Sequence, residues 1–189
     1  MNKNLRKSDT LAHTTGSFIN ILKDVNNVWD EKTQKIISLS PDVFRDVKEV
    51  ISSKGKNVTK KEEIIANLTT LCTLYNEMEQ VSAERIDLMI EMEGLDFPIK
   101  TPKKLLDLSK RDVEMNKLLK TIAHNISKTM TFIDQNITDV ELLENSLKSF
   151  ESTFTDYNEI IDISRFLTAN LEKELEKEFQ KARKYGDMV

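Results

Sequence analysis

The sequence predicts an all-α protein: an elongated antiparallel helical bundle or coiled coil of three long helices, with an N-terminal long helix and a short helix. Only four glycines and three prolines occur among 189 residues, too few for the many tight turns of an all-β or doubly wound fold. Charged residues make up 32% of the chain and aromatic residues 6%, which is typical of long amphipathic helices around a narrow core. Apolar residues recur in steps of three and four, which indicates helices that pack along one face.

The N-terminal segment, residues 1–56, is expected to form one long helix and one short capped helix that pack on the bundle or extend it. A single apolar stripe covers residues 11–39. Ser40 and Pro41 then favour a break, because serine caps helices and proline suits the first position of a new one. Gly55 is expected to end the short helix.

The second segment, residues 57–189, is expected to hold the three long helices, in one continuous domain with the first segment. Thr59 and Glu62 have the spacing of a capping box, which predicts a helix start, and Gly94 is expected to end that helix. The break at residues 94–100 is short, so this helix and the next are expected to be antiparallel neighbours.

The middle long helix is expected to start at Thr101, a capping residue followed by a proline. Asp112 is the one polar residue in its apolar stripe, and Arg85 interrupts the stripe of the preceding helix. Antiparallel packing brings these two positions to a similar depth. We therefore expect a buried Arg85–Asp112 pair that fixes the register of the helices more than their stability.

The last helix carries the strongest apolar stripe and is expected to start at a second capping box, Thr138 with Glu141. The three long helices would measure roughly 50, 50 and 70 Å, so the last overhangs by about two to three turns. Leu171, Leu175 and Phe179 lie on the stripe of the overhang and need a partner, so they are candidate partner-binding residues. Either the first helix or a second copy of the chain can cover them.

The charge balance and the cysteine usage limit the partners and the location. Twenty-eight basic and thirty-two acidic residues give a net charge of −4, so nucleic acid is not expected as a partner and a membrane is not required. Cys72 is the only cysteine, which favours a reducing compartment. The N-terminus lacks the apolar stretch of a signal peptide, and a cytoplasmic or nuclear location is expected.

No catalytic, cofactor-binding or metal-binding site is predicted, and the protein is not expected to be an enzyme. His13 and His124 lack a second ligand at the spacing that helical metal sites use. Cys72 lies beside an apolar stripe and is interpreted as a small buried side chain. No glycine-rich loop is present to bind phosphates.

Lys60, Lys61, Lys103 and Lys104 lie at predicted helix starts, where the helix dipole favours anions instead. They are candidate contacts for an acidic partner, a phosphate or a lipid headgroup, with solvent-exposed lysines of no special role as the alternative. Thr101, followed by proline and two lysines, resembles the site of cyclin-dependent kinases. It is a candidate phosphosite, because a phosphate there would sit at a helix N-terminus beside the two lysines.

The apolar stripes exceed what one bundle of unequal helices can cover. We therefore interpret the chain as a non-enzymatic helical scaffold or adaptor subunit, which mediates protein–protein interactions within a larger intracellular complex. Its partners are expected to be other proteins that bind through helical surfaces. The sequence leaves open whether the chain forms a homodimer.

The alternative function is a membrane module. Residues 143–185, which end in a basic run at 181–184, resemble the long middle helix of BAR modules. The resemblance implies a dimer that binds and bends a membrane through a basic face. That face would combine the basic run with Lys54, Lys56, Lys60 and Lys61.

Overall fold

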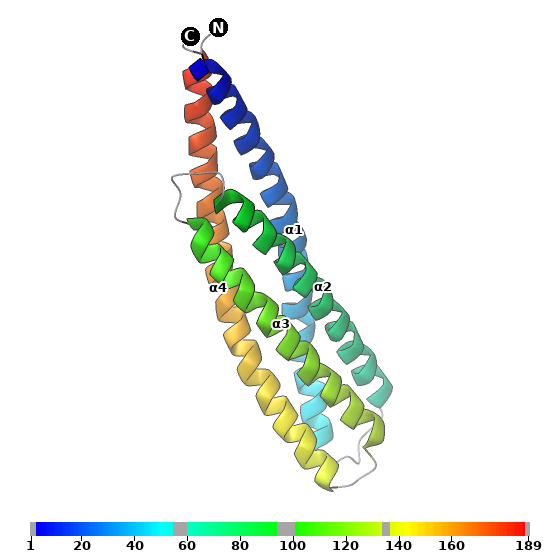
Figure 1. The fold of residues 1–189 in the computed structure, drawn as a ribbon. Coiled ribbons are helices and arrows are strands. Elements are labelled where there is room, and N and C mark those ends of the chain that lie inside the picture. Colours follow the sequence, from blue (N-terminus) through cyan, green and yellow to red (C-terminus); the bar gives the residue numbers. More distant parts are fainter. Residues whose placement is uncertain (1–2, 55–59, 94–100, 134–136, 188–189) are drawn as a thin grey trace.

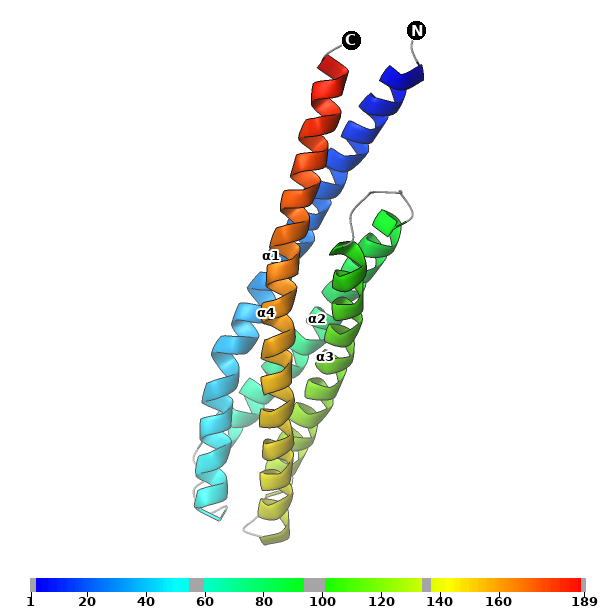
Figure 2. The ribbon, with the colours of Figure 1, turned by 90° about the vertical axis from the view of Figure 1, so that its left-hand side faces the viewer.

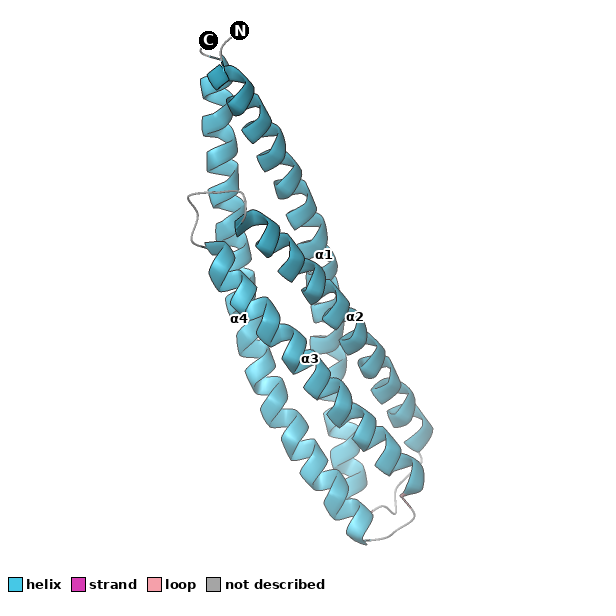
Figure 3. Ribbon diagram, viewed as in Figure 1, coloured by secondary structure: helices cyan, strands magenta, loops and turns pink. Residues whose placement is uncertain are grey.

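The computed structural model describes residues 3–54, 60–93, 101–133 and 137–187, with side chains from Gly16 onward except at 93, 101, 137, 182–183 and 185–187. Its four helices are α1 (Lys3–Ser52), α2 (Lys61–Glu93), α3 (Thr101–Phe132) and α4 (Ile137–Asp187). Every regular element in the described ranges is a helix (Figure 3). The predicted all-α fold is confirmed.

The helices run alternately up and down and form a closed four-helix arrangement (Figure 1). α1 packs against α2 and α4, and α3 packs against the same two helices. α1 and α4 contain 50 and 51 residues, whereas α2 and α3 contain 33 and 32. The two long helices therefore continue together past the α2–α3 hairpin, and both chain termini lie at that end (Figure 2).

The interior consists of two apolar clusters that follow each other along the bundle. The larger cluster fills the part where all four helices run side by side, and it includes Trp29, Leu68, Leu119 and Tyr157. The second cluster lies toward the hairpin end, and it contains Phe18, Leu22, Met89, Leu105, Leu171 and Leu175. α1 thus contributes to both clusters, so segments 1–56 and 57–189 share one core.

Aromatic side chains connect three of the helices in the larger cluster. Phe44 of α1 meets Phe150 and Phe154 of α4 edge-on, with ring centroids 4.8 and 5.5 Å apart. Tyr75 of α2 meets Tyr157 of α4 edge-on at 6.3 Å. Such edge-to-face pairs are favourable because the positive ring edge points at the negative ring face.

The expected helix break at Ser40 and Pro41 is wrong, because α1 continues to Ser52 with Pro41 inside it. Ser40 does not cap a new helix: its Oγ donates a hydrogen bond to the carbonyl of Ile36 at 2.8 Å. Pro41 is exposed, while Val43 and Val47 lie in the same cluster as Ile36. Burial of the continuous stripe on both sides of Pro41 outweighs the hydrogen bond that proline cannot make.

The other expected boundaries agree with the structure to within two residues. α2 ends immediately before Gly94, α3 begins at Thr101, and α4 begins one residue before Thr138. Thr59 and Gly55 lie outside the described residues. The hairpin of α2 and α3 is antiparallel, as expected from the short break between them (Figure 1).

Candidate protein-interaction site

The candidate site is the extension in which α1 and α4 run beyond the α2–α3 hairpin (Figures 1 and 2). Leu171 and Leu175 are fully buried at the base of this extension, in one cluster with Phe18 and Leu22 of α1. The same cluster contains Met89 of α2 and Leu105 of α3. Helices of this chain, α1 among them, therefore cover these two leucines, which form part of its core.

Phe179 lies one turn further along α4 and is only partly buried. It packs at the edge of the second cluster, over Gly16 of α1. A Cβ atom on residue 16 would lie 3.2 Å from Cε2 of the Phe179 ring, closer than most such contacts. The missing side chain of Gly16 thus lets the ring lie close against α1.

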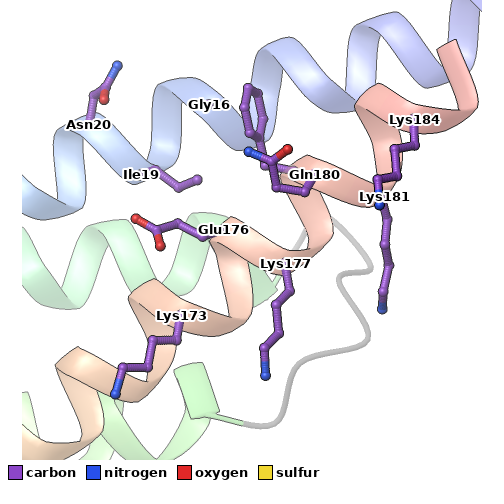
Figure 4. A pocket seen from close by; sticks show the side chains of 10 residues that line it. Gly16, Ile19, Asn20, Lys173, Glu176, Lys177, Gln180, Lys181 and Lys184 are labelled. Atoms are coloured by element: carbon purple, nitrogen blue, oxygen red, sulfur yellow. The ribbon is translucent and has the colours of Figure 1, made fainter. Parts of the chain in front are cut away.

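A groove of about 820 Å³ opens beside Phe179, between α1 and α4 (Figure 4). Gly16, Ile19 and Asn20 line it from α1. From α4 it is lined by Lys173, Glu176, Lys177, Phe179, Gln180, Lys181 and Lys184. The groove thus combines apolar groups with positive charge, a combination that suits the apolar and acidic residues of another protein.

The lysines of the groove follow one another along α4 at intervals of four, four and three residues. Lys181 is paired with Glu178 at 2.6 Å. Lys173, Lys177 and Lys184 are exposed and make no ion pair with any described residue. Their charges are therefore available to an acidic partner.

A second, smaller groove of about 360 Å³ lies between α3 and α4 and shares Lys173 and Lys177 with the first. Lys104 and Phe166 also line it, and 66% of Phe166 is exposed. Lys104 is thus placed near the candidate site. Lys103 is exposed, and Thr101 is the first residue of α3, although its side chain lies outside the described part.

Lys60 and Lys61 lie at the opposite end of the bundle, where α2 begins. Lys60 is exposed, whereas Nζ of Lys61 donates a hydrogen bond to the carbonyl oxygen of Thr131 at 2.8 Å. Thr131 lies in the last turn of α3, where the helix dipole favours a cation. Lys61 therefore has a structural partner in the same chain.

Arg85 and Asp112 lie in one buried polar layer between the two apolar clusters, and both are fully buried. The Asp112 carboxylate accepts hydrogen bonds from Trp29 Nε1 and Asn116 Nδ2, each at 2.9 Å, and from Ser82 Oγ. The Arg85 guanidinium stacks on the Trp29 ring, with Cζ 4.4 Å from the centroid. Trp29 therefore connects the two charged groups.

The guanidinium of Arg85 is incompletely hydrogen-bonded. Nη2 donates to Thr168 Oγ1 at 3.1 Å, whereas Nε and Nη1 have no partner among the described residues. Burial lowers the pKa of Arg85 to about 10, and the nearby Asp112 carboxylate acts in the opposite direction. Burial also raises the pKa of Asp112, against the effect of its hydrogen bonds from Ser82 and Trp29. Both charges are thus held in the interior at an energetic cost.

Sequence reasoning placed Arg85 and Asp112 at one depth but did not identify Trp29, Asn116 and Thr168 as their neighbours. Trp29 lies within the apolar stripe of residues 11–39, and a buried indole N–H usually needs an acceptor, which was a signal for a polar neighbour. Thr168 lies on the stripe of α4 seven residues before Leu175, so its polar side chain was a visible signal.

The remaining sequence predictions concern a metal, a membrane and Cys72. The described part of the chain contains no group of three or more His, Cys, Asp or Glu side chains placed to hold a metal ion. None of its described helices combines the length and low polarity of a membrane-crossing segment. Cys72 is half-buried, and burial raises the pKa of its thiol.

The lysines of the predicted BAR-like face lie at two ends of the molecule. Lys54, Lys60 and Lys61 lie where α1 ends and α2 begins, whereas Lys181 and Lys184 lie near the end of α4 (Figure 1). Lys56 lies outside the described residues. The placed lysines therefore do not gather into one continuous patch.

Comparison with protein-family models, with curated proteins and with solved structures finds no match to this chain.

Proposed function

We propose that this protein is a non-enzymatic scaffold or adaptor subunit that binds other proteins of a larger complex in the cytoplasm or nucleus. One observation carries the proposal. α1 and α4 project together past the hairpin and present a groove between them, lined by a partly buried phenylalanine and by lysines, three of which make no ion pair with a described residue.

The partner that fits this groove is an amphipathic helix with an acidic face. The bundle has four helices up to Leu175, whereas only α1 and α4 continue beyond the hairpin. An added helix could bury an apolar side chain against Phe179 and Ile19. Its carboxylates would face Lys173 and Lys177, which would favour encounter with acidic partners over basic ones.

The test combines affinity purification from the native extract with a change at the groove. Phe179→Ser removes the apolar contact at the groove. Phe132→Ser is the matched control, because Phe132 is 69% exposed and lies at the other end of the bundle. We expect a stable set of co-purifying proteins that Phe179→Ser loses and Phe132→Ser keeps. Circular dichroism of both variants would verify that the helices remain folded.

A photo-crosslinking amino acid locates the contact directly. Asn20 is exposed on the α1 wall of the groove, and Leu118 on α3 is an exposed control position. Crosslinks from position 20 but not from 118 to the same partner would support the proposal. The absence of any co-purifying protein, or equal crosslinking from both positions, would contradict it.

A further inference from the structure

α4 carries a second stripe on its outer face, opposite the one that packs into the core. The stripe starts at Leu142 and continues in alternating steps of three and four residues (142, 145, 149 and so on) to Lys184. All of these positions are exposed except the half-buried Asn170. Asp156 and Glu159 are the acidic residues of this outer stripe, and the stripe residues before them are uncharged. Both acidic residues precede the middle of the stripe, whereas its basic residues follow the middle.

The middle of the outer stripe is apolar and its second half is basic. Ile163 and Phe166 lie in the middle with 42% and 66% of their surfaces exposed. Lys173, Lys177 and Lys184 follow them. No ion pair joins these three lysines to any described residue, so their charges are uncompensated within the described part of the chain.

The surface is hollowed along this part of the stripe. The smaller groove between α3 and α4 is lined by Phe166, Lys173 and Lys177 together with residues beside them. An apolar side chain of a second helix could therefore lie beside Phe166 without displacing the core.

A stripe that is acidic before an apolar middle and basic after it is complementary to itself in the antiparallel direction. When two such helices pair about a two-fold axis between positions 163 and 166, Ile163 faces Phe166 of the other copy. Asp156 then faces Lys173, and each pair occurs twice because of the symmetry. No like charges meet directly along the stripe.

From position 145 to position 184, the rest of the stripe is compatible with this register, because the facing residues are polar. They are Asn145 with Lys184, Ser149 with Gln180, Ser152 with Lys177, and Glu159 with Asn170. Beside the stripe, Lys148 and Lys181 of the two copies also lie opposite each other. Each of these two lysines is already paired within its own helix, with Glu144 and Glu178. The paired region would be about 60 Å long at about 1.5 Å per residue.

We propose that the protein forms an antiparallel homodimer through the outer stripe of α4, with Ile163 and Phe166 at the two-fold axis and Asp156 facing Lys173 of the other copy. A second copy is favoured over an unrelated acidic helix, because the chain itself supplies both charge signs at equal distances from the apolar middle. The inference goes beyond the proposed function, since self-association requires no other protein.

The outer stripe shares Lys173, Lys177, Gln180 and Lys184 with the groove between α1 and α4. A second copy would therefore cover one wall of that groove and leave Asn20 and the α1 wall accessible. Failure of either hypothesis can be recognised separately. The groove is tested at Phe179 and Asn20, whereas the dimer is tested at Asp156 and Lys173.

The test is a charge swap followed by sedimentation velocity of the pure full chain at several concentrations and salt levels. Asp156→Lys and Lys173→Glu each turn two symmetric attractions into repulsions, so each should weaken dimerisation about tenfold or more at low salt. The double variant restores opposite charges in both pairs and should dimerise like the wild type. An equimolar mixture of the two single variants should form a heterodimer.

Matched controls reverse exposed charges on or beside α2, which lies diagonally across the bundle from α4. Asp87→Lys and Lys60→Glu should leave the dimer unchanged. Because Asp156 and Lys173 are exposed, the thermal unfolding of the variants should match the wild type. The wild-type dimer should also weaken as salt rises. A wild-type chain that stays monomeric, a dimer insensitive to both single variants, or a double variant that does not recover would overturn the proposal.

Discussion

Removal of the Asp112 carboxylate is the most demanding test of the buried polar layer. In Asp112→Ala, the donor groups of Trp29, Ser82 and Asn116 lose their shared acceptor in a fully buried site. The Arg85 guanidinium also loses its nearby negative charge. A buried charge left without its nearby counter-charge costs about 3–5 kcal/mol, and one unsatisfied buried donor about 1–3 kcal/mol. We expect the free energy of unfolding to fall by about 3–5 kcal/mol.

The assay is urea unfolding followed by far-UV circular dichroism and by the fluorescence of Trp29, the only tryptophan. Asp107→Ala is the control, because it removes an exposed carboxylate from the same helix and should change stability by less than about 0.5 kcal/mol. A loss below about 1 kcal/mol for Asp112→Ala would show that the layer is not charged or not dry, and would refute the reasoning.

The double variant Arg85→Met, Asp112→Leu separates stability from register. No charge remains in this layer, so its loss of stability should be smaller than that of either single change. If the layer determines register, hydrogen exchange should nevertheless show weaker protection around this layer in the double variant. If the stability lost by the double variant equals the sum of the losses of the two single variants, Arg85 and Asp112 do not interact.

Three further changes test other parts of the fold. Pro41→Ala should stabilise the chain in thermal unfolding by about 1–3 kcal/mol, because α1 regains a backbone hydrogen bond at an exposed position. A loss of stability in this variant would mean that proline is favourable at position 41. Lys61→Glu should destabilise the chain by about 0.3–1 kcal/mol, because the new carboxylate repels the carbonyl end of α3. Lys60→Glu should be neutral or slightly stabilising. Equal effects of the two variants in urea unfolding would contradict the contact between Lys61 and α3. Burial raises the pKa of both Tyr75 and Tyr157 above the ordinary value of 10.0. Their contribution to stability is therefore fully present below pH 10 and is lost as the pH rises through the pKa values of the two tyrosines in the folded chain. Absorbance titration should therefore show Tyr75 and Tyr157 ionising together with alkaline unfolding. Ionisation of both residues near pH 10 in the folded chain would contradict their burial.

The helices could be predicted because their apolar period persists over many turns, and the period does not depend on knowing the neighbours. The Pro41 error shows where local signals compete. Ser40 and Pro41 have the chemistry of a helix start, but Val43 and Val47 continue the phase of Ile36 beyond them. A phase that continues across a proline indicates one buried face, and the burial of that face determined the outcome.

The environment of Arg85 could be predicted only in part, because it depends on which helices are neighbours. The connection between α2 and α3 is short, so the depth of Asp112 relative to Arg85 follows from the chain itself. Trp29 and Thr168 come from α1 and α4, and the sequence alone did not show which side chains of these two helices face Arg85. For the same reason, the sequence left open whether α1 or a second copy covers Leu171 and Leu175.

We expect the buried layer also to affect how far α1 and α4 extend beyond the hairpin. Arg85 meets the face of Trp29 and the hydroxyl of Thr168. A slide of the hairpin by one heptad in either direction would bring the guanidinium to the positions seven residues away on α1 and α4. Those positions are Leu22, Ile36, Ile161 and Leu175, all fully buried and apolar.

A guanidinium set among such side chains would lose its hydrogen bond and its aromatic contact, at a cost of several kcal/mol. The apolar stripes alone would tolerate that slide, because their heptad spacing repeats every seven residues. We therefore expect Arg85, which has polar partners at a single depth, to help fix where the hairpin stops along α1 and α4. The position of the hairpin in turn sets how much of the two long helices extends beyond it.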